Sequence, residues 1–188
     1  FVKREVEAYR RCGILEHGLL RVGCPACGFE RLVAFSCKKR GICPSCLGRR
    51  MTDTACHLRE RVIPAEPLRQ WVCSLPWELR LRVGYDGTLC SQVLRAFVEE
   101  MARSYRRRAK RELGLRSVAE GHGGAVTFIQ RFDSALRLNP HFHTLALDGV
   151  YVRHPEDGAL VFHALSPPTA GEVAEVARRT AERVRRLL

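Results

Sequence analysis

The sequence predicts an α+β fold in which a small zinc-binding module is followed by an antiparallel sheet with helices packed on one face. Residues 12–46 contain paired cysteines, glycines and prolines, and too few apolar residues to form a core. Further along, short apolar runs bounded by proline or glycine predict strands, and longer segments with apolar residues every three or four positions predict helices. The order strand, helix, strand, strand, hairpin, helix favours one sheet covered on one side.

The first domain is expected to span residues 1–63. Residues 1–11 favour a short helix, and residues 47–63 carry apolar side chains at helical spacing up to Pro64. The tract 64–67 begins and ends with proline, so we place the domain boundary there. A second domain is then expected over residues 68–188.

The second domain begins with residues 70–75, an apolar run stopped by Pro76 that predicts a core strand. Residues 88–113 predict a long helix, because apolar residues recur every four positions and Gly114 provides a C-terminal stop. Strands are expected around Thr127 and His143, followed by a hairpin over 151–162 and a last helix from Thr169.

The composition favours a polyanionic partner. The 188 residues include 32 Lys and Arg against 20 Asp and Glu, a formal charge of +12, and the pI is about 9.8. Such a basic balance is typical of nucleic-acid binding, with an anionic membrane surface as the alternative. No apolar run approaches the ~18 residues of a membrane-spanning helix, and no secretory signal is evident. We expect a cytoplasmic, nucleoid-associated bacterial protein.

The nine cysteines indicate metal binding rather than disulfides, because thiols stay reduced in the cytosol. Two Cys-x2-Cys pairs, Cys24 with Cys27 and Cys43 with Cys46, are separated by 15 residues, which is typical of a zinc site. Four thiolates would close a tetrahedral shell, as a structural zinc requires. A second zinc site is open to a further group of residues: Cys12, His17, Cys37, and either Cys56 or His57. Alternatively, these cysteines are small buried residues.

His141 and His143 lie two residues apart in an apolar run that predicts a strand. Alternate side chains of a strand share one face, so both imidazoles would point the same way and Phe142 the other. Two imidazoles on one rigid strand suit an open, catalytic metal site. The alternative is a pair of polar residues on the solvated face of a strand.

Two basic clusters are candidates for DNA contacts: Lys38, Lys39 and Arg40 in the cysteine module, and Arg106, Arg107 and Arg108 near the end of the long helix. Both could equally be solvated surface, and cations also stabilise a helix C-terminus without any ligand. Tyr105 lies beside the second cluster, in a setting that could favour attack by its phenolate on phosphate. A tyrosine on the helix surface is the alternative.

Several segments together resemble a known family. Residues 120–132 (EGHGGAVTFIQRF), 138–143 (LNPHFH) and 147–151 (LDGVY) are similar to the HUH (His-hydrophobic-His) transposases of the insertion sequence ninety-one family. Residues 36–40 (SCKKR) and 43–51 (CPSCLGRRM) resemble that family's zinc-binding domain, and residues 69–76 (RQWVCSLP) its first core strand. The resemblance covers nearly the whole chain.

The resemblance implies metal-dependent cleavage of one DNA strand, with a 5′ phosphotyrosine and a free 3′ hydroxyl as products. His141 and His143 would hold Mg or Mn, Gln130 would be a third ligand, and Asp148 is a less favoured choice. In this family the tyrosines lie on a helix well downstream of the histidines. Both ends of the sequence look cut, so we expect an incomplete HUH-type domain whose nucleophile lies beyond residue 188.

Two other hypotheses remain at this point. The chain could be a non-catalytic zinc-ribbon DNA-binding protein in which the histidine pair is inert. It could also be a relative of relaxases or replication initiators that uses an upstream tyrosine such as Tyr105.

Overall fold

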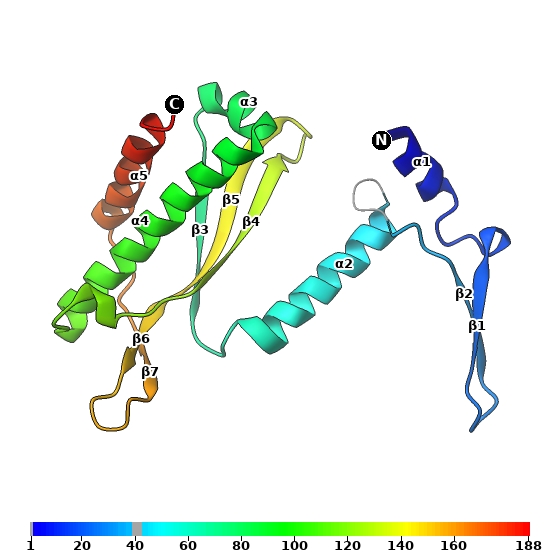
Figure 1. Cartoon of the computed structure of the whole chain (residues 1–188), viewed down its shortest axis with the longest axis horizontal. Helices are drawn as coiled ribbons and strands as arrows, with labels where there is room; N and C mark the ends of the chain where they lie inside the picture. Colours follow the sequence, from blue (N-terminus) through cyan, green and yellow to red (C-terminus); the bar gives the residue numbers. More distant parts are fainter. Residues whose placement is uncertain (1, 39–42) are drawn as a thin grey trace. The chain divides into compact units, whose positions relative to one another are not determined.

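The computed structural model describes residues 2–38 and 43–188, which form two compact units, Phe1–Pro64 and Ala65–Leu188 (Figure 1). We describe each unit by itself. The first contains two α-helices and a hairpin, with a short 3-10 turn at Leu15–His17: α1 (Val2–Arg10), β1 (Leu19–Gly23), β2 (Glu30–Ala34) and α2 (Pro44–His57), which continues as a π-helical turn at Leu58–Val62.

The hairpin of β1 and β2 was not predicted from the sequence. Its antiparallel register runs from Leu19 opposite Ala34 to Gly23 opposite Glu30. The connecting turn holds Cys24 and Cys27 and is closed by backbone hydrogen bonds between Cys24 and residues 28 and 29. Gly28 has a φ of +71°, a left-handed conformation that glycine adopts without strain.

The second unit is built on a three-stranded antiparallel sheet, which confirms the predicted fold class. Its strands are ordered β3-β5-β4, so β5 lies in the centre. Strands β6 and β7 form a separate antiparallel hairpin, with Gly149 opposite Ala164. The bounds of these strands are β3 (Leu68–Ser74), β4 (Ala125–Phe132), β5 (Leu138–Leu147), β6 (Gly149–Arg153) and β7 (Leu160–Ala164).

Three helices complete this unit: α3 (Trp77–Tyr85), α4 (Gly87–Leu113) and α5 (Ala170–Arg185). The Asp86 carboxylate caps α4 by accepting hydrogen bonds from the backbone of Thr88 and Leu89, each at 2.9 Å. Gly114 ends the helix in the left-handed conformation. Six residues at four-residue intervals are buried along one side of α4: Leu89, Val93, Phe97, Met101, Tyr105 and Ala109.

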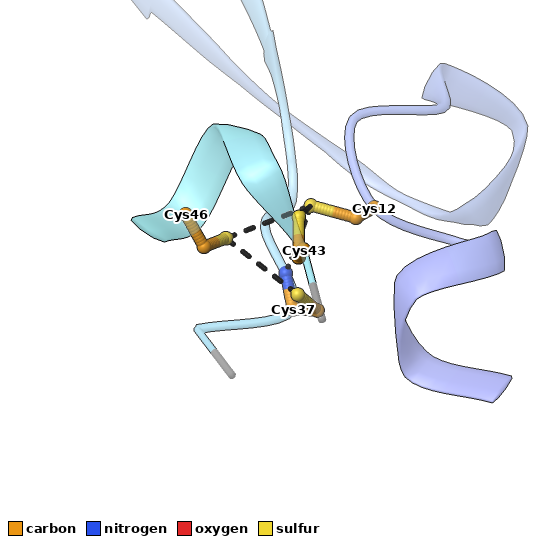
Figure 2. A group of neighbouring side chains, drawn as sticks. All are labelled: Cys12, Cys37, Cys43 and Cys46. Carbon is orange, nitrogen blue, oxygen red and sulfur yellow. Dashed lines mark hydrogen bonds between the residues drawn. The ribbon is translucent and has the colours of Figure 1, made fainter. Parts of the chain in front are cut away.

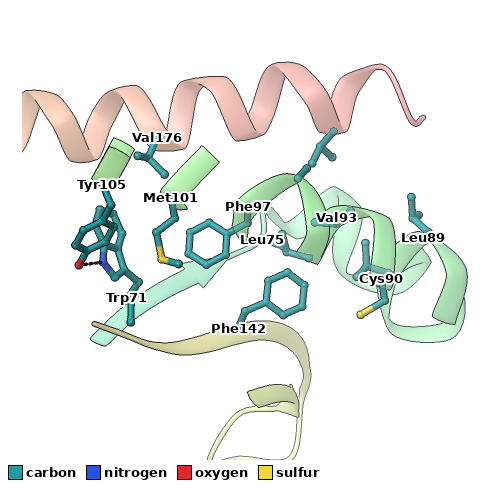
Figure 3. Packing of buried hydrophobic residues seen from close by; sticks show 14 of the residues in the cluster. Trp71, Leu75, Leu89, Cys90, Val93, Phe97, Met101, Tyr105, Phe142 and Val176 are labelled. Carbon is teal, nitrogen blue, oxygen red and sulfur yellow. Dashed lines mark hydrogen bonds between the residues drawn. The ribbon is translucent and has the colours of Figure 1, made fainter. Parts of the chain in front are cut away.

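The hydrophobic core lies between α4 and one face of the sheet, and α5 packs along α4 (Figure 1). Figure 3 shows Phe142 of β5 below Leu75 and Phe97, with Val176 of α5 on the far side of α4. Burying such large aromatic and aliphatic side chains supplies most of the driving force for folding. The buried face of β5 is therefore fixed in place by the core.

The two faces of β5 differ in burial. Phe142, Thr144 and Ala146 are buried toward the core, whereas His141 and His143 are half-buried on the opposite face. We call that opposite side the open face of the sheet. The side-chain alternation predicted for the histidine strand is thus what β5 shows.

Helix α3 was missed by the sequence analysis. Its inner side buries Val83 and half-buries Leu79, but Trp77, Leu81 and Tyr85 point outward and are exposed. Large apolar residues on both sides of a short helix hide the usual periodicity. Among the described residues, no helix is both long and apolar enough to cross a bilayer.

Candidate metal centres

Four cysteine side chains meet in the first unit. The Sγ atoms of Cys12, Cys37, Cys43 and Cys46 all lie within 4.8 Å of one another (Figure 2). Individual Sγ to Sγ distances of 3.4, 3.5 and 3.7 Å are close to the ~3.8 Å expected between thiolates that are each about 2.3 Å from a central zinc. Four sulfur ligands in this arrangement fit a closed structural zinc site.

The backbone brings these cysteines together from three places in the chain. Cys12 lies in the turn after α1, Cys37 follows β2, and Cys43 and Cys46 lie at the start of α2. The backbone N–H of Gly13 donates to the carbonyl of Phe35 at 3.0 Å, which fixes the turn after α1 beside the end of β2. The cluster therefore links α1, the hairpin and α2, in a unit whose hairpin alone would be marginally stable.

The electrostatics of the cluster favour a thiolate at Cys46. Burial acts to raise the pKa of Cys46, but hydrogen bonds with Cys37, Cys12 and Cys43 and with the backbone of Lys38 lower it to about 7. The position in the first turn of α2 also favours negative charge. Because the thiolate is the form of cysteine that ligates metal, this environment suits zinc binding.

Cys24 and Cys27 do not belong to this cluster, which corrects the grouping expected from the two Cys-x2-Cys pairs. They lie in the β1–β2 turn, whereas Cys43 and Cys46 are joined by Cys12 and Cys37. The five residues of β2 lead away from that turn over about 17 Å of strand. Sequence spacing alone could not show that the intervening residues form a strand rather than a compact loop.

The second zinc site expected from Cys12, His17, Cys37 and His57 is not assembled. Within residues 2–38 and 43–188, the four-cysteine cluster is the only group of three or more His, Cys, Asp or Glu side chains close enough to share a metal ion. Cys12 and Cys37 are used in that cluster. His17 lies in the 3-10 turn before β1, and Cys56 and His57 lie at the end of α2.

The histidine pair is the second candidate centre. The rings of His141 and His143 have centroids 5.0 Å apart, close enough for both to reach one ion at about 2.1 Å from each nitrogen. Nδ1 of His141 lies 2.6 Å from the carbonyl oxygen of Asn139. A carbonyl only accepts, so this Nδ1 carries the proton and Nε2 keeps a free lone pair.

Gln70 on β3 orients the second histidine. Its side-chain amide lies 2.8 Å from Nδ1 of His143. The nearer atom is the amide nitrogen Nε2 of Gln70, but the oxygen and nitrogen of an amide exchange places by a simple flip. In the flipped orientation Gln70 accepts from Nδ1–H and leaves Nε2 of His143 available as a ligand. Both histidines then have a hydrogen-bonded Nδ1 and an available Nε2, the usual arrangement of a metal-binding histidine. The sequence analysis did not identify Gln70.

The neighbouring strands place further side chains beside the pair on the open face. Directly opposed residues of antiparallel strands share a face. Gln130 of β4 is opposite His141, with Ser74 of β3 on its other side, and Phe128 of β4 is opposite His143. Gln130 therefore lies next to the histidine pair, where an amide oxygen could complete a coordination sphere.

Two other polar residues have different roles. Asp148 accepts two hydrogen bonds from Arg69, at 2.7 and 2.6 Å, and this ion pair occupies both carboxylate oxygens. Tyr105 is buried on the core side of the sheet, where Trp71 donates a hydrogen bond to its hydroxyl at 3.2 Å (Figure 3). Burial raises the pKa of Tyr105. Tyr105 thus faces away from the histidines, which corrects the hypothesis of an upstream nucleophile at this position.

The basic residues expected to contact DNA differ in exposure. Lys38, Arg106 and Arg107 are exposed, whereas Lys39 and Arg40 lie outside the described residues. Arg108 is buried, donates to the carbonyl of Ser166, and has its guanidinium 5.4 Å from the centre of the Tyr105 ring. Arg108 is therefore a core residue between α4 and the start of α5, which corrects its expected role at the DNA.

Comparisons with known families give two matches, one for each part of the chain. Residues 1–75 match the family model described as "Transposase zinc-binding domain", from the insertion sequence ninety-one family, and residues 124–185 match the model described as "Putative transposase". The first region contains the four-cysteine cluster, and the second contains His141 and His143. No curated protein and no solved structure matches the chain. On these two matches, the chain belongs to the transposases of the insertion sequence ninety-one family.

Proposed function

We propose that this transposase cleaves one strand of DNA with a metal ion held by His141 and His143. The observation that carries the proposal is the pair of imidazoles on the open face, with ring centroids 5.0 Å apart and a hydrogen-bond partner at each Nδ1. Inert surface histidines would not need both rings to be oriented in this way. The proposal includes Gln130 as the third ligand, because it lies opposite His141 on the same face.

Mg or Mn at this site would polarise the scissile phosphate and offset the charge that develops during its cleavage. The protein's own contribution is rigidity. β5 is the central strand, and the burial of Phe142 between the two histidines fixes their backbone. The phosphate would approach from the open face, next to Ser74 and Phe128.

The nucleophile in this proposal is a tyrosine in the chain beyond residue 188. Tyr105 is buried on the other face of the sheet, and Tyr151 packs edge-on against Phe162 in the β6–β7 hairpin. Tyr9 on α1 and Tyr85 on α3 are exposed, but both lie upstream of the histidines in the sequence, whereas the family resemblance implies a downstream nucleophile. The attacking phenolate would leave the 5′ phosphate attached to protein and release a 3′ hydroxyl. We further propose that the DNA is single-stranded at this site, with the +12 charge of the chain supplying attraction to its phosphates.

The test is calorimetric titration of Mn²⁺ into the zinc-loaded wild-type chain and into His141→Ala and His143→Ala. We expect one Mn²⁺ site in the wild type and a loss of affinity of at least about 10-fold in each variant. His154→Ala is the matched control, since His154 is exposed at the end of β6 and pairs with Asp157. Equal Mn²⁺ binding by all four proteins would favour a zinc-dependent DNA-binding protein with an inert histidine pair.

A further inference from the structure

The outer side of α3 exposes three large apolar side chains in a row. Trp77, Leu81 and Tyr85 are spaced four residues apart, so they share one side of the helix. Their relative exposures are 74, 65 and 83%. We call these three residues the α3 stripe. Single exposed apolar residues need no explanation, but an aligned row of this kind marks a binding surface.

Both ends of α3 lie near the end of the sheet where β3 ends and β5 begins. Trp77 follows β3 three residues after Ser74, which is directly opposite His141. Near the other end, a Cβ on Gly84 would lie only 2.8 Å from the Leu138 side chain, so the helix is in close contact with the start of β5. Leu138 precedes His141 by three residues. The helix therefore packs at the end of the sheet where β5 begins, and His141 is the nearer of the two histidines to that end.

The charges around the stripe fit a polyanion rather than a second apolar surface. The guanidinium of Arg80 lies 5.7 Å from the centre of the Trp77 ring and is fixed by a hydrogen bond to the carbonyl of Leu75. Arg82 is exposed on the same helix, and Arg131 donates to the carbonyl of Gly84. The acidic residue of α3 is Glu78, which is exposed, so the arginines give this surface a net positive charge.

We propose that the α3 stripe is a stacking platform for the unpaired bases of single-stranded DNA, and that it leads the strand to the histidine pair. Aromatic faces stack with any base, and neighbouring arginines neutralise the phosphates between the stacked bases. Arg80 covers one face of the Trp77 ring, and a DNA base would stack on the opposite face. This inference rests on the proposed function, because it assigns the surface that presents DNA to that site.

The platform is tested with a fluorescent oligothymidylate of about 12 nucleotides, a length within the range bound by single-strand-binding folds. Trp77→Ala and Tyr85→Ala should each weaken binding about five-fold or more, and the double variant by a larger factor. The slope of affinity against salt should not change, because stacking releases no counterions. Leu160→Ala, which removes an exposed apolar side chain from β7, should bind as the wild type does.

Tryptophan emission gives a second measurement that does not depend on the variants' affinity. Only two tryptophans are present, and Trp71 is buried in the core. Oligothymidylate should quench the wild-type emission, and Trp77→Phe should remove the quenching. All substituted side chains are exposed, so circular dichroism should confirm an unchanged fold.

Unchanged oligothymidylate affinity in the double variant would overturn the platform while leaving the Mn²⁺ result, and with it the proposed function, intact. A wild-type dimer that becomes a monomer on Trp77→Ala would also overturn it, since the stripe would then be an interface between copies of the chain. A wild-type chain with neither Mn²⁺ binding nor affinity for single strands would contradict the proposed function itself.

Discussion

Gln70 and His143, which are 73 residues apart in sequence, lie side by side on the open face with 2.8 Å between the amide and Nδ1. The contact crosses from β3 to β5, so it depends on the register that places Val72 opposite His143. A hydrogen bond at Nδ1 selects the tautomer and fixes the ring. In the proposed function, Gln70 would be a positioning residue that acts through His143.

Replacing Gln70 with leucine should weaken Mn²⁺ binding about 10-fold, because the His143 ring loses the partner that holds its tautomer. Gln70→Glu should restore or strengthen binding, since a carboxylate accepts from Nδ1–H more strongly than an amide does. Mn²⁺ titration measures both effects. Gln92→Leu changes an exposed glutamine on α4 and should have no effect. Equal affinity in Gln70→Leu and the wild type would show that the contact does not support a metal site.

The four-cysteine cluster predicts one zinc ion per chain. Cys12→Ser or Cys37→Ser should abolish zinc binding and unfold the first unit, because three thiolates cannot close the structural shell. The matched control is the double variant Cys24→Ser, Cys27→Ser, which should keep the zinc because these residues lie in the hairpin turn. Elemental analysis and circular dichroism check both results. If the control variant alone lost its zinc, the result would instead support a zinc site formed by Cys24, Cys27, Cys43 and Cys46.

Tyr105→Phe should destabilise the second unit by about 1 kcal/mol and leave Mn²⁺ affinity unchanged. The variant removes the hydroxyl that accepts from Trp71 Nε1 in the core, and a buried hydrogen bond contributes about that much. Chemical denaturation gives the stability, and calorimetry gives the affinity. A stability equal to that of the wild type, with Mn²⁺ binding lost, would instead connect Tyr105 to the metal site.

Local patterns predicted the elements of the second unit other than α3, because they depend on neighbouring residues. Four-residue spacing and Gly114 predicted α4, and alternation along β5 predicted that His141 and His143 share a face. Long-range partners were harder. Nothing in the sequence near Gln70 indicates His143, since the contact arises only from the pairing of β3 with β5.

The cysteine module shows the same limit. Both Cys-x2-Cys pairs were evident, but which pairs meet depends on the β1–β2 hairpin, whose apolar residues Leu20, Val22 and Val33 are exposed and gave no core pattern. Arg108 likewise resembled its neighbours Arg106 and Arg107 in sequence. Only the helical phase that α4 shares with Tyr105 and Ala109 turns it inward.

The contact between α4 and α5 provides a test that depends on pH. Arg183 of α5 pairs with Glu99 and, at 3.1 Å, with the buried Glu100 of α4. Hydrogen bonds from Arg95 and Arg183 lower the pKa of Glu99 to about 2. Because the folded pKa is lowered from 4.5, the stabilisation is fully present above about pH 4.5 and is lost as the pH falls toward 2.

Arg183→Met should therefore lower the stability of the second unit at pH 7 by about 1–3 kcal/mol, because Glu100 stays buried with only Arg103 as a partner. The difference from the wild type should shrink as the pH falls from about 4.5 toward 2, because Glu99 becomes protonated over that range. Thermal unfolding at several pH values measures it. Arg185→Met, an exposed arginine on the same helix, should unfold as the wild type does. A difference that stays constant from pH 7 to about pH 3 would mean that Arg183 stabilises α5 through the packing of its alkyl chain instead of its charge.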